Sequence, residues 1–252
     1  MNTVSVGESA GRDVQERCSI GAGASPGYLL PLLQLSDSAL PTGAFSHSFG
    51  MESYLADGTI TDEATFAAWL RAYVSRQLAY TDGLAIRMVF DALHLGDLDA
   101  VWNLDRLLAA LTLPEQVRTA AATIGRRTAE VGTVVAPESF LGDYLAELDA
   151  GRCHGHPAVA FALLAHAVDA PPAAAIEAHL FAAVTSLTQN AVRAIPIGQT
   201  AGQRVQRSLH DVVADAVATA MTLTDEDLGA ASPGLEIAQM RHRRQRARMF
   251  MS

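Results

Sequence analysis

Apolar residues in this chain of 252 residues recur at intervals of three and four, the spacing that lines one face of a helix. The segment after Thr61 shows the pattern best, and its face is formed by Phe66, Trp69, Leu70, Tyr73, Val74 and Gln77. Half of the composition is hydrophobic, mostly alanine and leucine, whereas aromatic residues make up only 6%. Strands favour β-branched and aromatic side chains. The sequence therefore predicts an all-α protein without a sheet.

Capping residues, prolines and glycines predict where the helices begin and end. A first helix is expected over residues 28–35. The expected N-caps of the next four helices are Ser46, Thr61, Asp82 and Asp97. Prolines then begin segments that end near residues 135, 148, 168 and 194, and a last helix carries Leu209 to Met221. We expect about ten helices in one domain, residues 28–231, between a disordered tail (1–27) and a separate C-terminal tail (232–252).

Charge and cysteine content indicate which partners and which compartment the protein can have. The formal net charge is −9, which argues against nucleic acid as the main partner. Cys18 and Cys153 are too few for a disulfide framework, so a reducing cytoplasm fits best. Residues 1–27 lack the apolar core of a signal peptide, and the run 178–192 is too short and too polar to span a membrane. We expect a cytoplasmic protein that binds neither membrane nor nucleic acid.

Catalytic motifs are absent from the sequence. It holds no nucleophile elbow, no His-Glu-x-x-His, no di-iron Glu-x-x-His pair and no phosphate loop. Ser46, His47 and Ser48 are neighbours, but adjacent helix positions point about 100° apart and would not face one another. We expect no enzyme, and the missing Glu-x-x-His pairs also disfavour a metal-storing bundle.

Cys153, His154 and His156 place three ligand types for nickel or zinc within four residues. In the alternative interpretation, His156 caps the helix that begins at Pro157 and Cys153 is a small apolar filler. A complete metal site would need further ligands that the sequence does not place. We favour the alternative, and expect no tightly bound metal or cofactor.

The segment 38–52, SALPTGAFSHSFGME, joins two apolar helical segments. Pro41 fixes a turn and Gly43 is free to adopt a positive φ. Ser46 is expected to cap a helix that carries Phe49, Met51 and Leu55. Loops between helices usually need only to be polar. This combination therefore marks a candidate functional surface.

The C-terminal segment 233–252 carries clustered arginines in an otherwise acidic chain, and ends on apolar residues. Its arginines are Arg241, Arg243, Arg244, Arg246 and Arg248. The segment is either a solvated helix or an amphipathic peptide that docks into a partner. We favour docking, with Ile237, Met240 and Phe250 as anchors, because exposed Phe and Met side chains need a cover. A DNA-binding regulator with a basic C-terminal helix is the alternative, although no second basic patch is present to hold phosphates.

A third segment, 191–203, reads AVRAIPIGQTAGQ and is adequately explained as a corner between two helices.

Taken in order, these three segments resemble the motifs of the urease accessory protein family UreF, and the likeness extends from Tyr28 to Ser252. The first block spans residues 37–52, the second 191–203 and the third 236–252. The motif residues of the first two blocks are Pro41, Gly43, Phe45, Ser46, His47, Ser48, Glu52, Arg193, Gln199 and Gln203. The residues that the resemblance assigns to partner binding are Glu236, Ile237, Met240, Arg241, His242, Arg248, Phe250 and Ser252. Arg243 departs from the family, which usually has an acidic residue after the tail histidine.

The resemblance implies an all-helical, dimeric and non-enzymatic protein. It implies a complex with a UreD/UreH-type protein and a UreG-type GTPase that loads nickel into apo-urease. In that complex the UreF-type chain would bridge its two partners and tie GTP hydrolysis to nickel delivery. Residues 233–252 would become ordered on binding the UreD-type partner.

Overall fold

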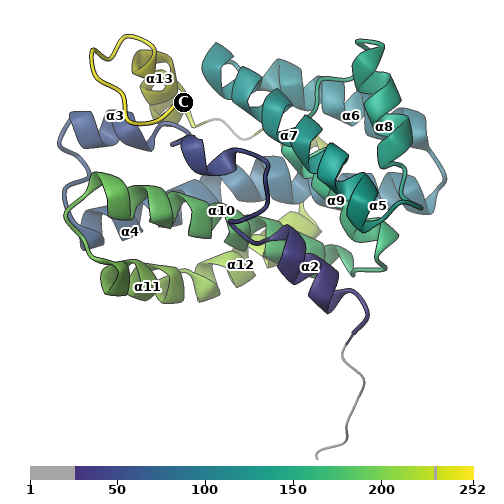
Figure 1. Cartoon of the computed structure of the whole chain (residues 1–252), viewed down its shortest axis with the longest axis horizontal. Coiled ribbons are helices and arrows are strands. Elements are labelled where there is room, and N and C mark those ends of the chain that lie inside the picture. Colours follow the sequence, from purple (N-terminus) through teal and green to yellow (C-terminus); the bar gives the residue numbers. More distant parts are fainter. Residues whose placement is uncertain (1–25, 230–231) are drawn as a thin grey trace, which may run out of the picture.

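The computed structural model describes residues 26–229 and 232–252, and within these ranges the backbone forms helices and turns without any strand. The prediction of an all-α fold is confirmed for these residues (Figure 1). Most of the predicted N-terminal tail, residues 1–25, lies outside them. The helices are α2 (Leu29–Leu35), η2 (Ala44–Ser46), α3 (Met51–Ala56), α4 (Glu63–Tyr73), η3 (Val74–Gly83), α5 (Leu84–His94), α6 (Leu98–Leu111), α7 (Glu115–Val135), α8 (Leu141–Asp149), α9 (Pro157–Ala167), α10 (Pro172–Ala194), α11 (Gln199–Ser208), α12 (His210–Thr222), η4 (Asp225–Asp227) and α13 (Pro233–His242).

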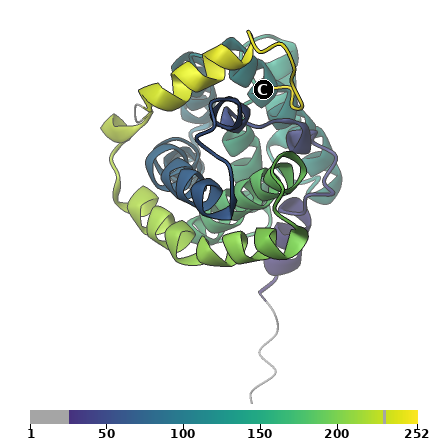
Figure 2. The same cartoon turned by 90° about the vertical axis from the view of Figure 1, so that its left-hand side faces the viewer.

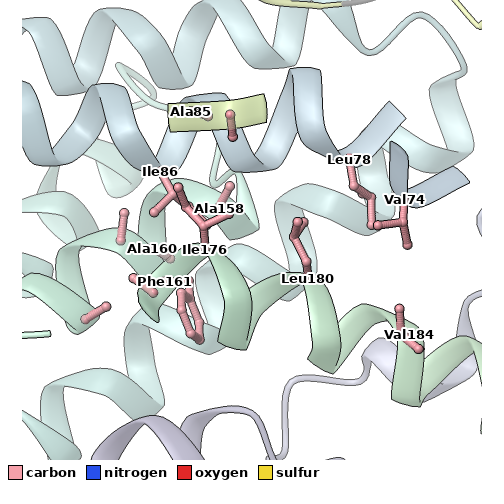
Figure 3. Close-up of a cluster of buried hydrophobic side chains, with 14 of the residues drawn as sticks. Val74, Leu78, Ala85, Ile86, Ala158, Ala160, Phe161, Ile176, Leu180 and Val184 are labelled. Atoms are coloured by element: carbon pink, nitrogen blue, oxygen red, sulfur yellow. The ribbon is translucent and has the colours of Figure 1, made fainter. Parts of the chain in front are cut away.

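Helix α9 lies at the centre of the core. Its residues from Ala158 to Ala165 are all buried, and it packs against α5, α7, α8 and α10. Figure 3 shows Phe161 of α9, Ile176 and Leu180 of α10 and Ile86 of α5 within one cluster of buried hydrophobic side chains. Each large apolar side chain buried here stabilises the fold by about 1.5–3 kcal/mol. An almost uniformly apolar helix is therefore explained by its central position.

Helices α4, η3 and α5 form one continuous rod from Glu63 to His94. Asp82, predicted to cap a new helix, lies inside this rod, so that prediction is wrong. Its backbone belongs to the π-helical segment η3, whose wider turn occurs at functional sites more often than elsewhere. The Asp82 carboxylate hydrogen-bonds to the side chains of Thr81 and His179. It does not cap the start of a helix.

Other helix boundaries agree closely with the sequence. Asp62, one residue after the predicted Thr61, caps α4 in a reciprocal arrangement with Thr65. Asp97 caps α6 as predicted, because its carboxylate accepts from Ala100 N at 2.9 Å. Gly96 ends the preceding helix with φ of +71°. Helices α7, α9 and α10 end within a residue or two of their predicted limits.

A single helix was expected after the break at residues 195–198, and it is two helices, α11 and α12, joined at Leu209. The part expected to carry Leu209 to Met221 is α12. After them, α13 packs against α3 and α7, so residues 233–242 lie on the helical body (Figure 2). The predicted tail 232–252 contains this helix followed by a turn segment that returns to the body. Among the described residues, no helix is both long enough and apolar enough to cross a membrane.

Candidate functional site

The motif loop, which we define as residues 41–50, does not form the predicted helix start. Ser46 ends the short helix η2, and its hydroxyl donates to Gly43 O at 2.8 Å. Phe49 and Gly50 have φ of 50° and 98°, values that no right-handed helix contains, so α3 begins only at Met51. The prediction that Ser46 caps a helix carrying Phe49 is therefore wrong. The backbone of residues 46–49 is left free to bind another segment.

The partner of the motif loop is the tail segment, which we define as residues 243–252. Met251 N donates to Ser46 O at 2.9 Å. The backbone oxygen of Ser252 accepts from Ser48 N at 2.5 Å and from Phe49 N at 3.0 Å. It also accepts from the Ser48 hydroxyl at 2.7 Å, while the Ser252 hydroxyl lies 2.8 Å from His47 Nδ1. Two of the three sequence blocks thus meet directly.

Glu52, at the start of α3, connects the tail segment with α13. Its Oε1 accepts from Met249 N at 2.5 Å, and its Oε2 accepts from Phe250 N at 3.1 Å. The same Oε2 lies 2.7 Å from Nε2 of His242, the last residue of α13. The His242 side chain is only 1% exposed. A single carboxylate therefore holds three donors in a nearly dry environment, where such bonds are strong.

The C-terminal end of helix α10, which carries Arg193 of the second sequence block, contacts the motif loop. The Asn190 amide donates to His47 O at 2.7 Å, and the Arg193 guanidinium donates to Phe45 O at 2.7 Å. The two side chains also bond to each other. Arg193 lies over the Phe250 ring at 5.4 Å, a favourable cation–π distance. Asn190 is fully buried, and its role was missed because a polar residue in an apolar helix gives no hint of its partner.

Gly50 has a second reason to be glycine besides its positive φ. A Cβ at this position would lie 2.8 Å from Cγ of Gln239 and 3.1 Å from Cδ1 of Leu235, both on α13. Gln239 donates to Phe49 O at 3.0 Å, and Ser53 donates to Ala238 O at 2.6 Å. Helix α13 therefore packs against the motif loop and α3 through these hydrogen bonds to backbone oxygens, in addition to its contact with Glu52.

The residues predicted to bind a partner divide into two groups. His242, Phe250 and Ser252 are buried within the chain itself. Ile237 and Met240 are both 48% exposed, and Arg241 and Arg248 are exposed as well, while Glu236 is partly buried. Phe250 thus contacts its own chain, and the exposed apolar side chains next to it, Met249 and Met251, were not among the predicted anchors.

The other predicted motif residues are also spread between interior and surface. Pro41 and Phe45 are exposed, whereas His47, Ser48 and Glu52 are buried. Gln199 and Gln203 are exposed on α11, with no hydrogen bond to the motif loop or the tail segment. The structure thus joins the first and third blocks and the Arg193 end of the second.

The segment Cys153–His156 has a structural role in the loop before α9. The buried Asp105 carboxylate accepts from the amides of His154 at 2.5 Å, Gly155 at 3.2 Å and His156 at 2.7 Å. His156 caps α9, as the alternative interpretation predicted, and burial raises the pKa of Cys153 to about 12. In residues 26–229 and 232–252, no group of three or more His, Cys, Asp or Glu side chains has the arrangement of a metal site.

A cavity of about 240 Å³ extends from the motif loop towards η3 and α10. Asp82 lines it, accepting from Thr81 at 2.8 Å and lying 3.0 Å from His179 Nε2. Burial alone would raise the pKa of Asp82, but the His179 hydrogen bond and the nearby His156 and His179 charges lower it to about 2. Burial lowers the pKa of His156, which also lines the cavity. This polar cluster was missed because its members are far apart in sequence.

Comparisons with known proteins place this chain among relatives that match most of its length. The model of the UreF family matches residues 60–210. The urease accessory protein UreF of Arthrobacter sp. (strain FB24) is 53% identical over 229 residues, which cover 91% of this chain and 99% of that protein. UreF of Paenarthrobacter aurescens (strain TC1) is 53% identical over 225 residues, covering 89% of this chain and 98% of that protein. UreF of Lachnoclostridium phytofermentans is 45% identical over 225 residues, with 89% and 99% covered.

Proposed function

Because the chain belongs to the UreF family of urease accessory proteins, we propose that it is a non-enzymatic assembly factor for apo-urease. In this proposal it bridges a UreD/UreH-type protein and a UreG-type GTPase, so that GTP hydrolysis is coupled to nickel delivery. Nickel is cargo of the complex, not a resident cofactor of this chain. The cytoplasm is the proposed compartment, in keeping with the buried unpaired Cys153.

The observation that supports the proposal most is the surface formed by α13 and the tail segment. Four apolar side chains there are exposed to between 48% and 66%: Ile237, Met240, Met249 and Met251. Exposed arginines lie next to them in the sequence, among them Arg241 and Arg248. In the part of the chain that the structure describes, only Arg243 of the arginines between residues 241 and 248 is engaged in an ion pair, with Glu115 at 2.6 Å. Methionines suit adaptable protein contacts, and arginines favour an acidic rim on the partner. We assign this surface to the UreD/UreH-type partner.

Reconstitution tests the proposed function. The chain is mixed with UreD/UreH-type and UreG-type proteins and apo-urease from one organism, and urease activity is measured after addition of nickel and GTP. We expect activation only when the chain is present, and no GTP turnover by the chain alone. Activation that proceeds equally without the chain would contradict the assembly role. GTP turnover by the chain that survives further purification would contradict the non-enzymatic part.

A further inference from the structure

Glu52 lies at a point where α3, α13 and the tail segment meet through one side chain. The neighbouring Ser53 makes a weaker second connection, because its hydroxyl donates to Ala238 O at 2.6 Å and lies 3.1 Å from Nε2 of Gln245. The carboxylate is 12% exposed, and its hydrogen bonds go to two backbone amides of the tail segment and one imidazole of α13. The other imidazole nitrogen of His242, Nδ1, lies 3.2 Å from Gln116 Oε1 on α7. Both ring nitrogens therefore face oxygen atoms, and α13 is fixed in rotation about its own axis.

The amide contacts determine which tail side chains point outwards. Phe250 and Ser252 are buried at 5% and 3% exposure, whereas Met249 and Met251 are 61% and 66% exposed. Buried and exposed side chains therefore alternate over the last four residues, of which Met249 and Phe250 lie in a bend around the Glu52 carboxylate. Glu52 fixes the alternation at Met249 and Phe250, and the motif loop fixes it at Met251 and Ser252.

We infer that Glu52 is a positioning residue for partner binding. Through the tail amides it orients Met249 and Met251, and through His242 it orients the exposed Ile237 and Met240 of α13. Its own side chain is too buried to contribute directly to a partner contact. This inference rests on the proposed function, because it names the residue that shapes the surface assigned above to the UreD/UreH-type partner. The exposed arginines Arg241 and Arg248 define that partner's site as apolar with an acidic rim.

The substitution Glu52→Gln keeps the shape of the side chain and removes its charge. The amide can accept through one oxygen only, so it cannot hold Met249 N, Phe250 N and His242 together. Glu63→Gln is the matched control, because Glu63 forms a charged pair with Arg204 between α4 and α11, remote from the tail segment in sequence and in contacts. Both variants lose one carboxylate, but only Glu52→Gln acts on the tail segment.

Two measurements on the full chain test the inference. The first is backbone hydrogen exchange at Met249 and Phe250, with the α9 amides as an internal reference. The second is affinity for the purified UreD/UreH-type protein. We expect Glu52→Gln to exchange at least tenfold faster at the two tail amides and to bind at least tenfold more weakly, while Glu63→Gln matches the wild type in both.

Each result decides something. Unchanged tail exchange, or faster exchange with unchanged affinity, would overturn the positioning role of Glu52. A wild-type chain that does not bind the UreD/UreH-type protein would overturn the proposed function itself, and the inference with it. If Glu52→Gln lowers the helix content of the whole chain, His242→Gln takes its place, since it disturbs the same carboxylate from the α13 side. The same two measurements then decide.

Discussion

At the scale of single residues, the tightest constraint lies where α7 crosses the loop before α9. A Cβ on Gly125 would overlap the carbonyl group of Gly155, and the backbone of Gly155 is held by Asp105 and cannot retreat. Gly142, on α8, has nothing within 4 Å of the same added atom. Alanine substitution at these two glycines therefore compares a position with no room for a methyl group with a position that has room.

Gly125→Ala should lower the free energy of unfolding by about 2–4 kcal/mol, because the added methyl group meets backbone atoms instead of a flexible side chain. Gly142→Ala should raise it by about 0.5–1 kcal/mol through better helix propensity. Urea denaturation monitored by circular dichroism measures both. Equal stabilities for the two variants would show that α7 and the loop can separate without cost.

Asp105 is fully buried and accepts from three backbone amides and from the Tyr144 hydroxyl at 2.5 Å. Asp105→Asn should reduce the free energy of unfolding by about 2–4 kcal/mol, since an amide NH₂ would face donors. Asp143→Asn on the exposed side of α8 is the control and should change it by less than about 0.5 kcal/mol. Chemical denaturation distinguishes them, and a neutral Asp105→Asn variant would mean that water replaces the carboxylate.

The stability of the chain should fall on mild acidification because burial lowers the pKa of His156 and of His47. Below about pH 6.5 the unfolded chain binds protons at these two histidines more readily than the folded chain does, so the free energy of unfolding falls as the pH is lowered through this range. His156→Gln should therefore flatten the decline between pH 7.5 and 5.5, whereas His94→Gln, at an exposed position, should not. Denaturation midpoints across this range provide the measurement, and parallel curves for all three proteins would contradict the assignment.

At the scale of elements, the tail segment combines a buried anchor with exposed charges. Phe250 packs inside the chain beneath Arg193, and Arg246 is exposed. Phe250→Ala should weaken binding of the UreD/UreH-type protein by on the order of tenfold or more at both low and high salt, since it loosens the tail segment. Arg246→Ala should weaken binding mainly at low salt, because screening removes its contribution.

Affinity measured for both variants across a salt series tests this pair of expectations. Deletion of residues 233–252 adds a further comparison: it should abolish partner binding while the remaining helices stay folded. Because α13 covers Glu52 and the motif loop, we expect the deletion also to lower the midpoint of thermal unfolding. Normal binding by the truncated chain would show that the tail segment is only a solvated extension.

Most helix boundaries could be predicted because their signals are local. Asp97, Gly96 and Pro157 act on the backbone within one turn of their own positions. The capping signals of Ser46 and Asp82 were equally local, but neither residue caps a helix. The Ser46 carbonyl binds Met251 of the tail segment, and the Asp82 carboxylate binds His179. The candidate site was predicted as three separate segments, whereas its centre, the contact of Glu52 with His242, joins positions 190 residues apart. No local pattern encodes such a pairing.

At the scale of the whole molecule, the long apolar segments do not by themselves require association. Residues 158–165 and the apolar face of α10 are buried within one chain, so covering them does not need a second copy of the chain. Exposed apolar side chains occur instead on α2 and η2, where Leu30 is 72%, Leu33 59% and Phe45 56% exposed. Leu30 and Leu33 lie one turn apart on α2, and apolar side chains that are exposed side by side in this way are typical of a protein contact.

We therefore predict a homodimer that depends on α2. Light scattering at micromolar concentration should give twice the chain mass for the wild type and the chain mass for a Leu30→Glu, Leu33→Glu double variant. Val134→Glu, at a position 82% exposed on α7, serves as the control and should remain dimeric. A wild-type monomer in the absence of partners would contradict the prediction, and a dimeric double variant would place the contact elsewhere.

The pairing of the motif loop with the tail segment also sets an order of events during synthesis. His47 leaves the ribosome about two hundred residues before Ser252, with which it pairs, and the whole helical body is made in between. The body can fold while the loop still lacks its partner, because α9 and its neighbours precede the tail in the chain. The surface that we propose for the UreD/UreH-type partner would therefore arise only after the tail segment has emerged. A nascent or prematurely terminated chain would be folded and yet unable to recruit them, so incomplete chains would be kept out of urease maturation.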